Sequence, residues 1–359
     1  MLLIFFGLAL SSSWGNGHAT TYRSLLRGLR ARGHRVIFYE RDVPWYGGHR
    51  DLERPDYAEV RLFAGWRDIR ATALAAARTA DAVVVGSYCG EAIAILDDLL
   101  SVRPRRLAFY DIDTPVTIAA LDHGRCEYLR PDQLAAVDLY LSFTSGPILK
   151  ELRRRGARCV RPLHCCADPE HYRPGPPIPP RWDLGYLGTY APDRQDKLRR
   201  LLLEPARRLP GQRFVVAGPM YSDQAGWPLN VEYLPHVPPG DHPTFYRSCR
   251  MTLSITRRAM VAWGHSPSIR LFEAAACEAP IITDPWPGLD EFFRTEQRPG
   301  EPSEVLVASD AGTVVRYLRE LSPLDLRRIA RAARGRVLRH HTGLHRAEQL
   351  ESYLQKIAP

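Results

Sequence analysis

The segment SPSIRLFE at 266–273 holds the residues best suited to bind an anionic group. We expect Ser266 to cap a helix whose first position is a proline. Backbone amides at Ser268 and Ile269 would then be free at the start of the helix. Together with the helix dipole and the guanidinium of Arg270, they favour a diphosphate as the ligand.

Glu273 lies about a turn and a half deeper in the same expected helix. A carboxylate there is suited to accept hydrogen bonds from two ribose hydroxyls. The alternative is a surface ion pair between Arg270 and Glu273, which would contribute only about 0.3 kcal/mol. The flanking Phe272 and the three alanines that follow Glu273 indicate a buried helix, where unpaired charge is costly. The sequence therefore favours the ligand interpretation.

A second candidate is the turn LGTYAPDRQ at 187–195, which follows an apolar run. Gly188 allows the backbone to approach a ligand, and Thr189 offers both a hydroxyl and an amide. Arg194 is expected to open the next helix. An ordinary connection from strand to helix is the alternative.

The loop SSSWGNGH at 11–18 follows the first apolar run of the chain. Gly15 and Gly17 permit tight turns and close approach of a ligand, while His18 is expected at the start of a helix. The glycine spacing does not match the GxGxxG pattern of dinucleotide sites. A purely structural turn is the alternative.

The motif YDIDTP at 110–115 ends another apolar run. Asp111 and Asp113 are separated by one residue, so both should project to the same side of an extended chain. Such a pair is suited to bind sugar hydroxyls, act as a base or hold a cation. A metal would need further ligands, and helix capping by Asp113 is a structural alternative.

The elements that would position these residues form a regular alternation of short apolar runs and helical patterns. This alternation predicts an α/β protein with two doubly wound parallel sheets. Strands are expected at 2–6, 36–39, 60–63, 82–85, 107–110 and 139–143 in the first half, and at 184–187, 214–217, 231–234, 251–255, 280–283 and 305–307 in the second. Ligands of such sheets bind at the carboxyl ends of the strands, so we expect a cleft between the two halves to hold the site.

A proline-rich segment at 173–181 is unsuited to a helix or central strand and is interpreted as a linker. It divides the chain into a first domain at 1–172 and a second at 181–340. A helix within 341–359 should cross back to the first domain.

Composition narrows the function classes. The chain has 359 residues and a formal charge of +9, carried almost entirely by arginine. Its arginine runs lack interleaved aromatics, which disfavours nucleic-acid binding and leaves open a peripheral contact with an acidic membrane surface. No apolar run reaches the roughly 20 residues of a membrane-spanning helix. Seven unevenly spaced cysteines suggest a reducing compartment, so we expect a cytoplasmic protein, and their spacing does not suggest a metal site.

With these motifs in place, the chain resembles the two-domain GT-B glycosyltransferases, and most closely the CgeB-like, spore-maturation group. The similarity is most specific at 266–284 and extends to the segments 14–18, 110–115 and 186–195. It implies two facing Rossmann-like domains, a nucleotide-sugar donor and no metal or other cofactor. It assigns the ribose to Glu273, the diphosphate to Ser268, Arg270, Thr189 and Tyr190, and the base to His236 and Val237.

The resemblance also implies transfer of a hexose, from a donor expected to be a UDP-sugar, to a hydroxyl acceptor bound by the first domain. His18 is similar to a loop histidine that acts as base in inverting relatives, with Asp113 or Asp111 as orienting group or substitute. Retaining relatives carry a glutamate where this chain has His265, so the stereochemical outcome stays open. The alternatives are a GT-B-like nucleotide-sugar epimerase and a non-catalytic nucleotide-sugar-binding protein.

Overall fold

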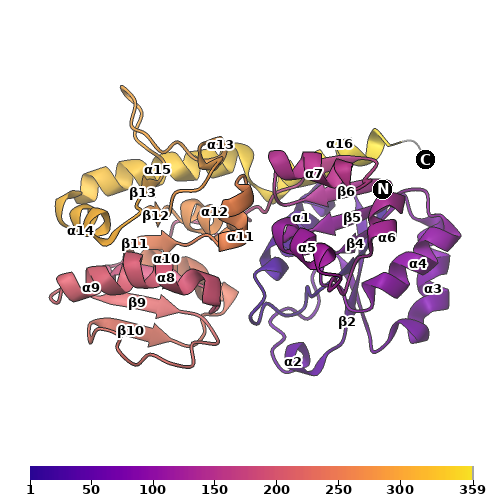
Figure 1. Ribbon diagram of the computed structural model, residues 1–359, viewed down its shortest axis with the longest axis horizontal. Helices are drawn as coiled ribbons and strands as arrows, with labels where there is room; N and C mark the ends of the chain where they lie inside the picture. Colours follow the sequence, from indigo (N-terminus) through magenta and orange to yellow (C-terminus); the bar gives the residue numbers. More distant parts are fainter. Residues whose placement is uncertain (358–359) are drawn as a thin grey trace. The chain divides into compact units, whose positions relative to one another are not determined.

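The computed structural model describes residues 1–357. The chain divides into two compact units, one made of residues 1–166 with the segment from Thr342 onward, the other of residues 167–341. Each unit is built around one parallel β-sheet (Figure 1). The prediction of an α/β protein with two doubly wound parallel sheets is confirmed.

The first unit has a seven-stranded sheet in the order β3-β2-β1-β4-β5-β6-β7. All neighbouring pairs in it are parallel. Its strands are β1 (Leu2–Gly7), β2 (Arg35–Arg41), β3 (Glu59–Phe63), β4 (Ala82–Gly86), β5 (Leu107–Asp111), β6 (Leu139–Ser142) and β7 (Val160–Pro162). Six of them match expected strands, and β7 is an addition to them.

The central strands of this sheet are buried on both faces, as their unbroken apolar sequence requires. In β1 every residue from Leu3 to Phe6 is at most 1% exposed. The helices of the unit are α1 (His18–Ala31), α2 (Pro44–Gly47), α3 (Trp66–Thr79), α4 (Ala92–Val102), α5 (Thr114–Asp122), α6 (Pro131–Ala136), α7 (Pro147–Arg154) and α16 (Gly343–Gln355).

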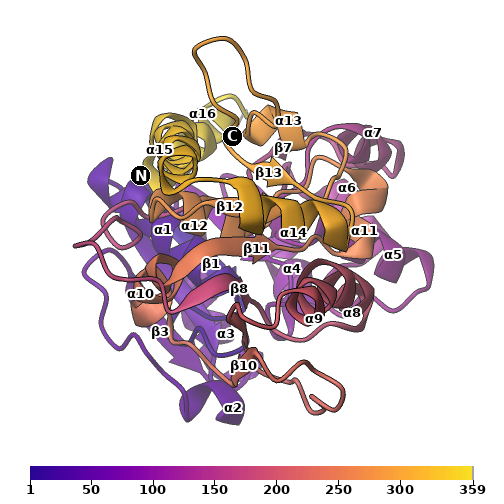
Figure 2. The same ribbon diagram turned by 90° about the vertical axis from the view of Figure 1, so that its left-hand side faces the viewer.

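The terminal helix α16 packs against α1, far from it in sequence (Figures 1 and 2). The two helices meet at a pair of glycines. A Cβ atom at Gly28 would lie 2.3 Å from the carbonyl oxygen of Gly343, and one at Gly343 would lie 2.0 Å from that of Ser24. Arg346 fixes the helix further, since its Nε donates to the carbonyl of His164 at 3.0 Å. The segment from Thr342 onward is therefore part of the first unit.

The second unit has a six-stranded parallel sheet in the order β10-β9-β8-β11-β12-β13. Its strands are β8 (Trp182–Leu187), β9 (Phe214–Ala217), β10 (Val231–Leu234), β11 (Cys249–Ser254), β12 (Ile281–Thr283) and β13 (Leu306–Val307). Its helical segments are η1 (Pro192–Arg194), α8 (Gln195–Leu198), η2 (Arg199–Leu203), α9 (Glu204–Arg208), η3 (Pro239–Asp241), α10 (His242–Ser248), α11 (Arg258–Trp263), α12 (Ile269–Ala276), α13 (Leu289–Phe292), α14 (Ala311–Glu320) and α15 (Pro323–His340).

Helices cover the second sheet in two groups. On one side η2 and α9 pack against α14, and on the other α12 packs against α10 and α15. The residues 173–181 contain neither helix nor strand, as their prolines require. They lie inside the second unit, and the border between the units falls earlier in the chain, at Cys166 and Ala167. Residues before the proline-rich segment already pack in this unit, for example Tyr172, which is buried beside His242.

Each sheet has a point where the strand order reverses direction, between β1 and β4 in the first unit and between β8 and β11 in the second. Loops at the carboxyl ends of strands on either side of such a point diverge and leave room for a ligand. His18 follows β1, and the 188–190 turn follows β8. The candidate site of each unit therefore lies at the reversal point of its sheet.

Candidate functional site

In the first unit, His18 is the first residue of α1, as expected from the sequence. Its backbone amide donates to the side-chain oxygen of Asn16 at 3.0 Å, and Gly17 is the N-cap residue of the helix. Gly17 has φ −67°, and a Cβ atom at this position would meet nothing within 4 Å, so its backbone borders open space. Neither turn geometry nor packing explains a glycine at position 17, which is consistent with close approach of a ligand.

The loop before His18 is held by a buried carboxylate that sequence reasoning did not identify. Glu40, 1% exposed, accepts hydrogen bonds from the amides of Leu10 and Ser11 at 2.7 and 2.9 Å, and from the Ser11 hydroxyl at 2.6 Å. A second anchor comes from Asp51, which binds Ser13 and pairs with Arg23 at 2.6 Å. The loop that carries His18 is thus rigidly positioned.

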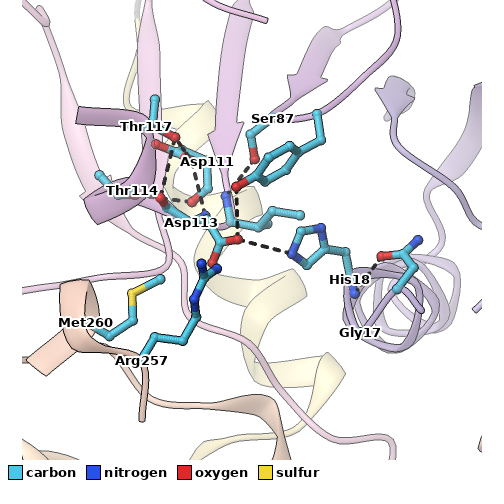
Figure 3. A network of polar contacts seen from close by, with 12 residues as sticks. Gly17, His18, Ser87, Asp111, Asp113, Thr114, Thr117, Arg257 and Met260 are labelled. Atoms are coloured by element: carbon cyan, nitrogen blue, oxygen red, sulfur yellow. Dashed lines mark hydrogen bonds and ion pairs between the residues drawn. The ribbon is translucent and has the colours of Figure 1, made fainter. Parts of the chain in front are cut away.

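The imidazole of His18 points toward Asp113 (Figure 3), with 3.7 Å between Nε2 and Oδ2. The same Oδ2 atom accepts a hydrogen bond from the hydroxyl of Tyr88 at 3.1 Å. The Tyr88 ring also stacks on His18, with 5.5 Å between ring centroids. These three residues come from the ends of β1, β4 and β5, which lie side by side in the sheet.

Tyr88 has a left-handed backbone conformation, with φ +61°. This conformation is costly for a residue with a side chain and tends to persist where the surroundings or a function require it. Burial, followed by the negative charge of Asp113, raises the pKa of the Tyr88 hydroxyl far above its ordinary value, so this hydroxyl stays a donor. Sequence reasoning did not select Tyr88, because an isolated tyrosine in a loop carries no motif.

Asp111 and Asp113 do not project to the same side, which corrects the sequence-based expectation. The strand ends at Asp111, and the chain turns before Asp113, which occupies the N-cap position of α5. Asp111 is fully buried and accepts a hydrogen bond from the Thr117 hydroxyl at 2.8 Å (Figure 3). It also accepts one from the Tyr140 hydroxyl at 2.5 Å.

Burial raises the pKa of Asp111 to about 6, while hydrogen bonds from Tyr140 and Thr117 act in the opposite direction. The amide of Asp113 also donates to Asp111, at 3.2 Å. Asp111 therefore supports the turn that presents Asp113, whereas the side chains of His18 and Asp113 are partly exposed, at 23% and 17%.

In the second unit, α12 begins at Ile269 with Ser268 as its N-cap. The expectation that Ser266 caps this helix is wrong. Pro267 disfavours the helical conformation for the residue before it, and Ser268 is itself extended, with ψ 139°. Ser266 is instead buried, with its hydroxyl 3.0 Å from the sulfur of Met260. The amides of Ser268 and Ile269 remain at the start of the helix, as expected.

Arg270 lies in the first turn of α12 and reaches back to the end of β8. Its Nε atom donates to the carbonyl of Leu187, and its Nη1 lies 3.2 Å from the Ser268 hydroxyl. The guanidinium also lies over the ring of Tyr186 at 5.3 Å. Arg270 and Glu273 therefore contact different partners, and the surface ion pair weighed from the sequence is not formed.

The turn after β8 is shaped around Arg270. A Cβ atom at Gly188 would lie 2.6 Å from Arg270 Nη2 and 2.8 Å from the Tyr186 hydroxyl, so the glycine makes room for these two side chains. The Thr189 carbonyl accepts a hydrogen bond from Arg194 at 2.9 Å. Tyr190 is 37% exposed. The structure thus brings Gly188, Thr189 and Arg270 together at the reversal point of the sheet, with Arg194 turned back onto the same turn.

Glu273 is 3% exposed and lies one turn deeper in α12 than Arg270. The hydroxyl of Tyr246 donates to its Oε2 atom at 3.2 Å. The Nδ1 atom of His242 lies 3.8 Å from the same Oε2. A buried carboxylate beside a hydroxyl donor remains a strong acceptor for ligand hydroxyls.

The loop after β10 carries His236 and Val237, which the family resemblance assigns to the base. The side chain of His236 is half-buried and Val237 is 9% exposed. The carbonyl of Val237 lies 3.2 Å from Nε2 of His242. Burial lowers the pKa of His242 to about 4. His242 is therefore neutral at pH 7 and forms no ion pair with Glu273.

His265 occupies a strained position in the loop before α12, with φ +50°. Its Nδ1 atom lies 2.8 Å from Oε1 of Glu291. Its ring fills the space beside Gly288, where a Cβ atom would lie 2.4 Å from Nδ1. The residue that departs from the retaining pattern is thus held in one orientation by its neighbours.

Two further findings concern residues 1–357. No group of three or more histidine, cysteine, aspartate and glutamate side chains in this range is arranged to hold a metal ion. No helix in it is long and apolar enough to cross a membrane.

Comparisons with known proteins agree with this architecture. Residues 194–352 match the family model described as "Glycosyl transferase-like". No curated protein matches the chain in sequence. An α-glucosyltransferase in complex with UDP superimposes with a TM-score of 0.72, at 12% identity over 99% of this chain and 100% of the other.

Two other solved structures are similar over the whole length. Sucrose-phosphate synthase from Thermosynechococcus elongatus has a TM-score of 0.68 and 14% identity, over 99% of both chains. HepE from Anabaena, in complex with UDP and glucose, has a TM-score of 0.68 and 12% identity, over 99% of this chain and 100% of the other. At these identities the structural likeness establishes the GT-B fold, and the family match covers the segment that bears Arg270 and Glu273. The chain therefore has the GT-B fold, and its residues 194–352 are similar to glycosyl transferases.

Proposed function

We propose that this enzyme transfers a hexose from a nucleoside-diphosphate sugar, most simply a UDP-sugar, to a hydroxyl acceptor, without a metal ion. The observation that carries the proposal is the buried carboxylate of Glu273, one turn below the N-terminus of α12 and Arg270. The carboxylate would bind the ribose. The helix N-terminus and the guanidinium beside it would bind the diphosphate.

The remaining donor contacts follow from the same arrangement. Ser268, Ile269 and Arg270 would bind the diphosphate, with Thr189 and Tyr190 on the adjoining turn. His236 and Val237 would flank the base. Similar proteins were solved with UDP or UDP-glucose, which supports a uridine nucleotide here.

Catalysis in this proposal needs little beyond positioning and charge. Departure of the nucleoside diphosphate places negative charge on its outer phosphate, and the α12 amides and Arg270 would stabilise that charge in place of a cation. His18 would accept the proton of the attacking hydroxyl, with Asp113 orienting the imidazole. We also propose that the chain belongs to the CgeB-like group of GT-B enzymes, because its segments 266–284 and 14–18 resemble that group.

Calorimetric titration with UDP, GDP, dTDP and CDP tests the donor assignment directly. We expect one nucleotide, UDP, to bind selectively and to raise the melting temperature by mass action. Absence of binding by all four to the folded enzyme would overturn the proposal. Incubating the matching nucleotide sugar without an acceptor separates the alternatives, because an epimerase would convert the donor sugar and a transferase would not.

A further inference from the structure

His242 connects two parts of the second unit that the proposed function uses separately. One ring nitrogen, Nε2, lies 3.2 Å from the carbonyl of Val237 in the loop after β10. The other, Nδ1, lies 3.8 Å from Oε2 of Glu273 on α12 and 3.4 Å from the hydroxyl of Tyr172. A single imidazole thus lies between the loop assigned to the base and the carboxylate assigned to the ribose.

The contacts of His242 determine where its hydrogen lies. A carbonyl oxygen can only accept, so the bond to Val237 requires the hydrogen on Nε2. In a neutral ring, Nδ1 is then an acceptor and faces Tyr172, which is a donor. Burial lowers the pKa of His242, which agrees with the neutral form.

The neutral form matters for Glu273. A protonated His242 would direct a charged N–H at the carboxylate and compete with ligand hydroxyls for it. A neutral His242 offers no donor on that side, while the hydroxyl of Tyr246 donates to the carboxylate at 3.2 Å. Arg270, the nearest cation on α12, is directed to Leu187 and Ser268.

We propose that His242 is a positioning residue for both the ribose and the base. Its Nε2 atom holds the carbonyl of Val237 in place, and its Nδ1 atom directs no hydrogen at Glu273, so the carboxylate can accept the ribose hydroxyls. The proposal rests on the function proposed above. It predicts that substitutions of His242 change which nucleotide is bound, beyond any loss of stability.

Two binding ratios measure the two roles. The ratio of dissociation constants for 2′-deoxy-UDP and UDP reports on the ribose, and the ratio for CDP and UDP reports on the base. In the unaltered enzyme we expect both ratios to exceed 10, the loss expected when a buried polar partner is left unmatched, about 1.4 kcal/mol or more.

The variant His242→Gln keeps an N–H that can reach the Val237 carbonyl but has no acceptor at the position of Nδ1. We expect it to bring the ribose ratio close to 1 and to leave the base ratio nearly unchanged. The variant His242→Ala removes both contacts and should bring both ratios close to 1. Tyr172→Phe removes the donor that faces Nδ1 of His242, so the imidazole is held less firmly beside Glu273, and this variant should lower the ribose ratio alone.

His171 supplies a matched control, because its Nε2 atom lies 2.8 Å from the carbonyl of Pro239, in the chain just beyond the same loop. His171→Gln therefore tests loop anchoring by a neighbouring histidine, and both ratios should stay at their original values. Melting temperatures are measured for every variant. Should His242→Ala not fold, His242→Gln and Tyr172→Phe still decide the question.

The outcomes separate the two proposals. If the unaltered enzyme binds none of the nucleotides, the proposed function fails. If it binds UDP with both preferences and the folded His242 variants keep them, the proposed function stands and the role of His242 is overturned. Loss of both preferences in His171→Gln as well would also overturn it, since loop anchoring alone would then explain the effect.

Discussion

Oδ2 of Asp113 lies 3.7 Å from Nε2 of His18 and 3.1 Å from the hydroxyl of Tyr88. One carboxylate oxygen thus faces an imidazole and a phenol that stack on each other. A carboxylate beside an imidazole can hold the ring in one orientation. In the proposed mechanism, this arrangement would orient the imidazole of His18 toward the proton that it accepts.

Replacing His18 by alanine should lower turnover by about 10²- to 10⁴-fold, the usual contribution of general-base catalysis. The dissociation constant of the donor should stay unchanged, because the residues assigned to the donor lie in the other unit. Turnover is measured with saturating donor, and donor affinity by calorimetry. His123→Ala removes an exposed histidine of the same unit and serves as the control. Near-normal turnover of the His18 variant would remove His18 from the mechanism.

Replacing Glu273 by glutamine should weaken UDP binding by about 10- to 150-fold, since hydrogen bonds to a charged group contribute about 1.5–3 kcal/mol. Glutamine keeps the size of the side chain and so limits damage to the buried site. The control is Glu278→Gln, where the carboxylate pairs with Arg331 on the surface. Calorimetry gives both affinities, and an unaltered affinity in the Glu273 variant would contradict the ribose assignment.

Much of this fold follows from the sequence, because parallel strands buried on both faces appear as short apolar runs between helical patterns. The strand β7 is not predictable in this way, because Val160–Pro162 has three residues and no apolar run. The start of α12 at Ile269 is predictable in principle, since Pro267 restricts the residue before it.

The candidate site is only partly predictable. His18 and Glu273 lie in motifs whose spacing fixes their place at a helix start and within a helix. Tyr88 and His242 are isolated residues in the sequence, and only the tertiary structure brings them to Asp113 and Glu273. The different surroundings of Asp111 and Asp113 also depend on the turn between them, which the residue spacing does not reveal.

Asp111 should make the stability of the enzyme depend on pH. Its pKa is raised from 3.8 to about 6 in the folded chain, chiefly by burial. Below about pH 3 the carboxyl is protonated in both states and its raised pKa has no effect on stability. As the pH rises toward 6 and beyond, the unfolded chain ionises more readily, so stability is lost, by roughly 3 kcal/mol in total.

The variant Asp111→Asn lacks this titration. We therefore compare the free energy of unfolding of the variant with that of the unaltered enzyme at about pH 4 and about pH 7.5. The variant should be more stable, relative to the unaltered enzyme, at the higher pH than at the lower one. Urea denaturation at the two pH values measures the shift. Lost hydrogen bonds to Tyr140 and Thr117 add a cost that is nearly the same at both pH values. A difference that does not change with pH would contradict a raised pKa.

Replacing Gly288 by alanine should destabilise the second unit more than replacing Gly300. Both glycines have positive φ, +85° and +77°, so alanine costs about 1 kcal/mol at either position through backbone strain alone. At Gly300 a Cβ atom meets nothing within 4 Å, whereas at Gly288 it would lie 2.4 Å from Nδ1 of His265. The clash should add about 1–3 kcal/mol, because the imidazole is held by Glu291 at 2.8 Å.

A double-mutant cycle isolates the clash from the strain. In a chain that already carries His265→Ala, the obstructing ring is gone, and Gly288→Ala should cost no more than Gly300→Ala. Urea midpoints of the four variants, converted with a common slope, provide the comparison. Equal costs for the two glycines in the unaltered background would mean that the His265 ring moves aside freely. The orientation of His265 would then not be fixed by Gly288, and the ring would be free to follow a bound ligand.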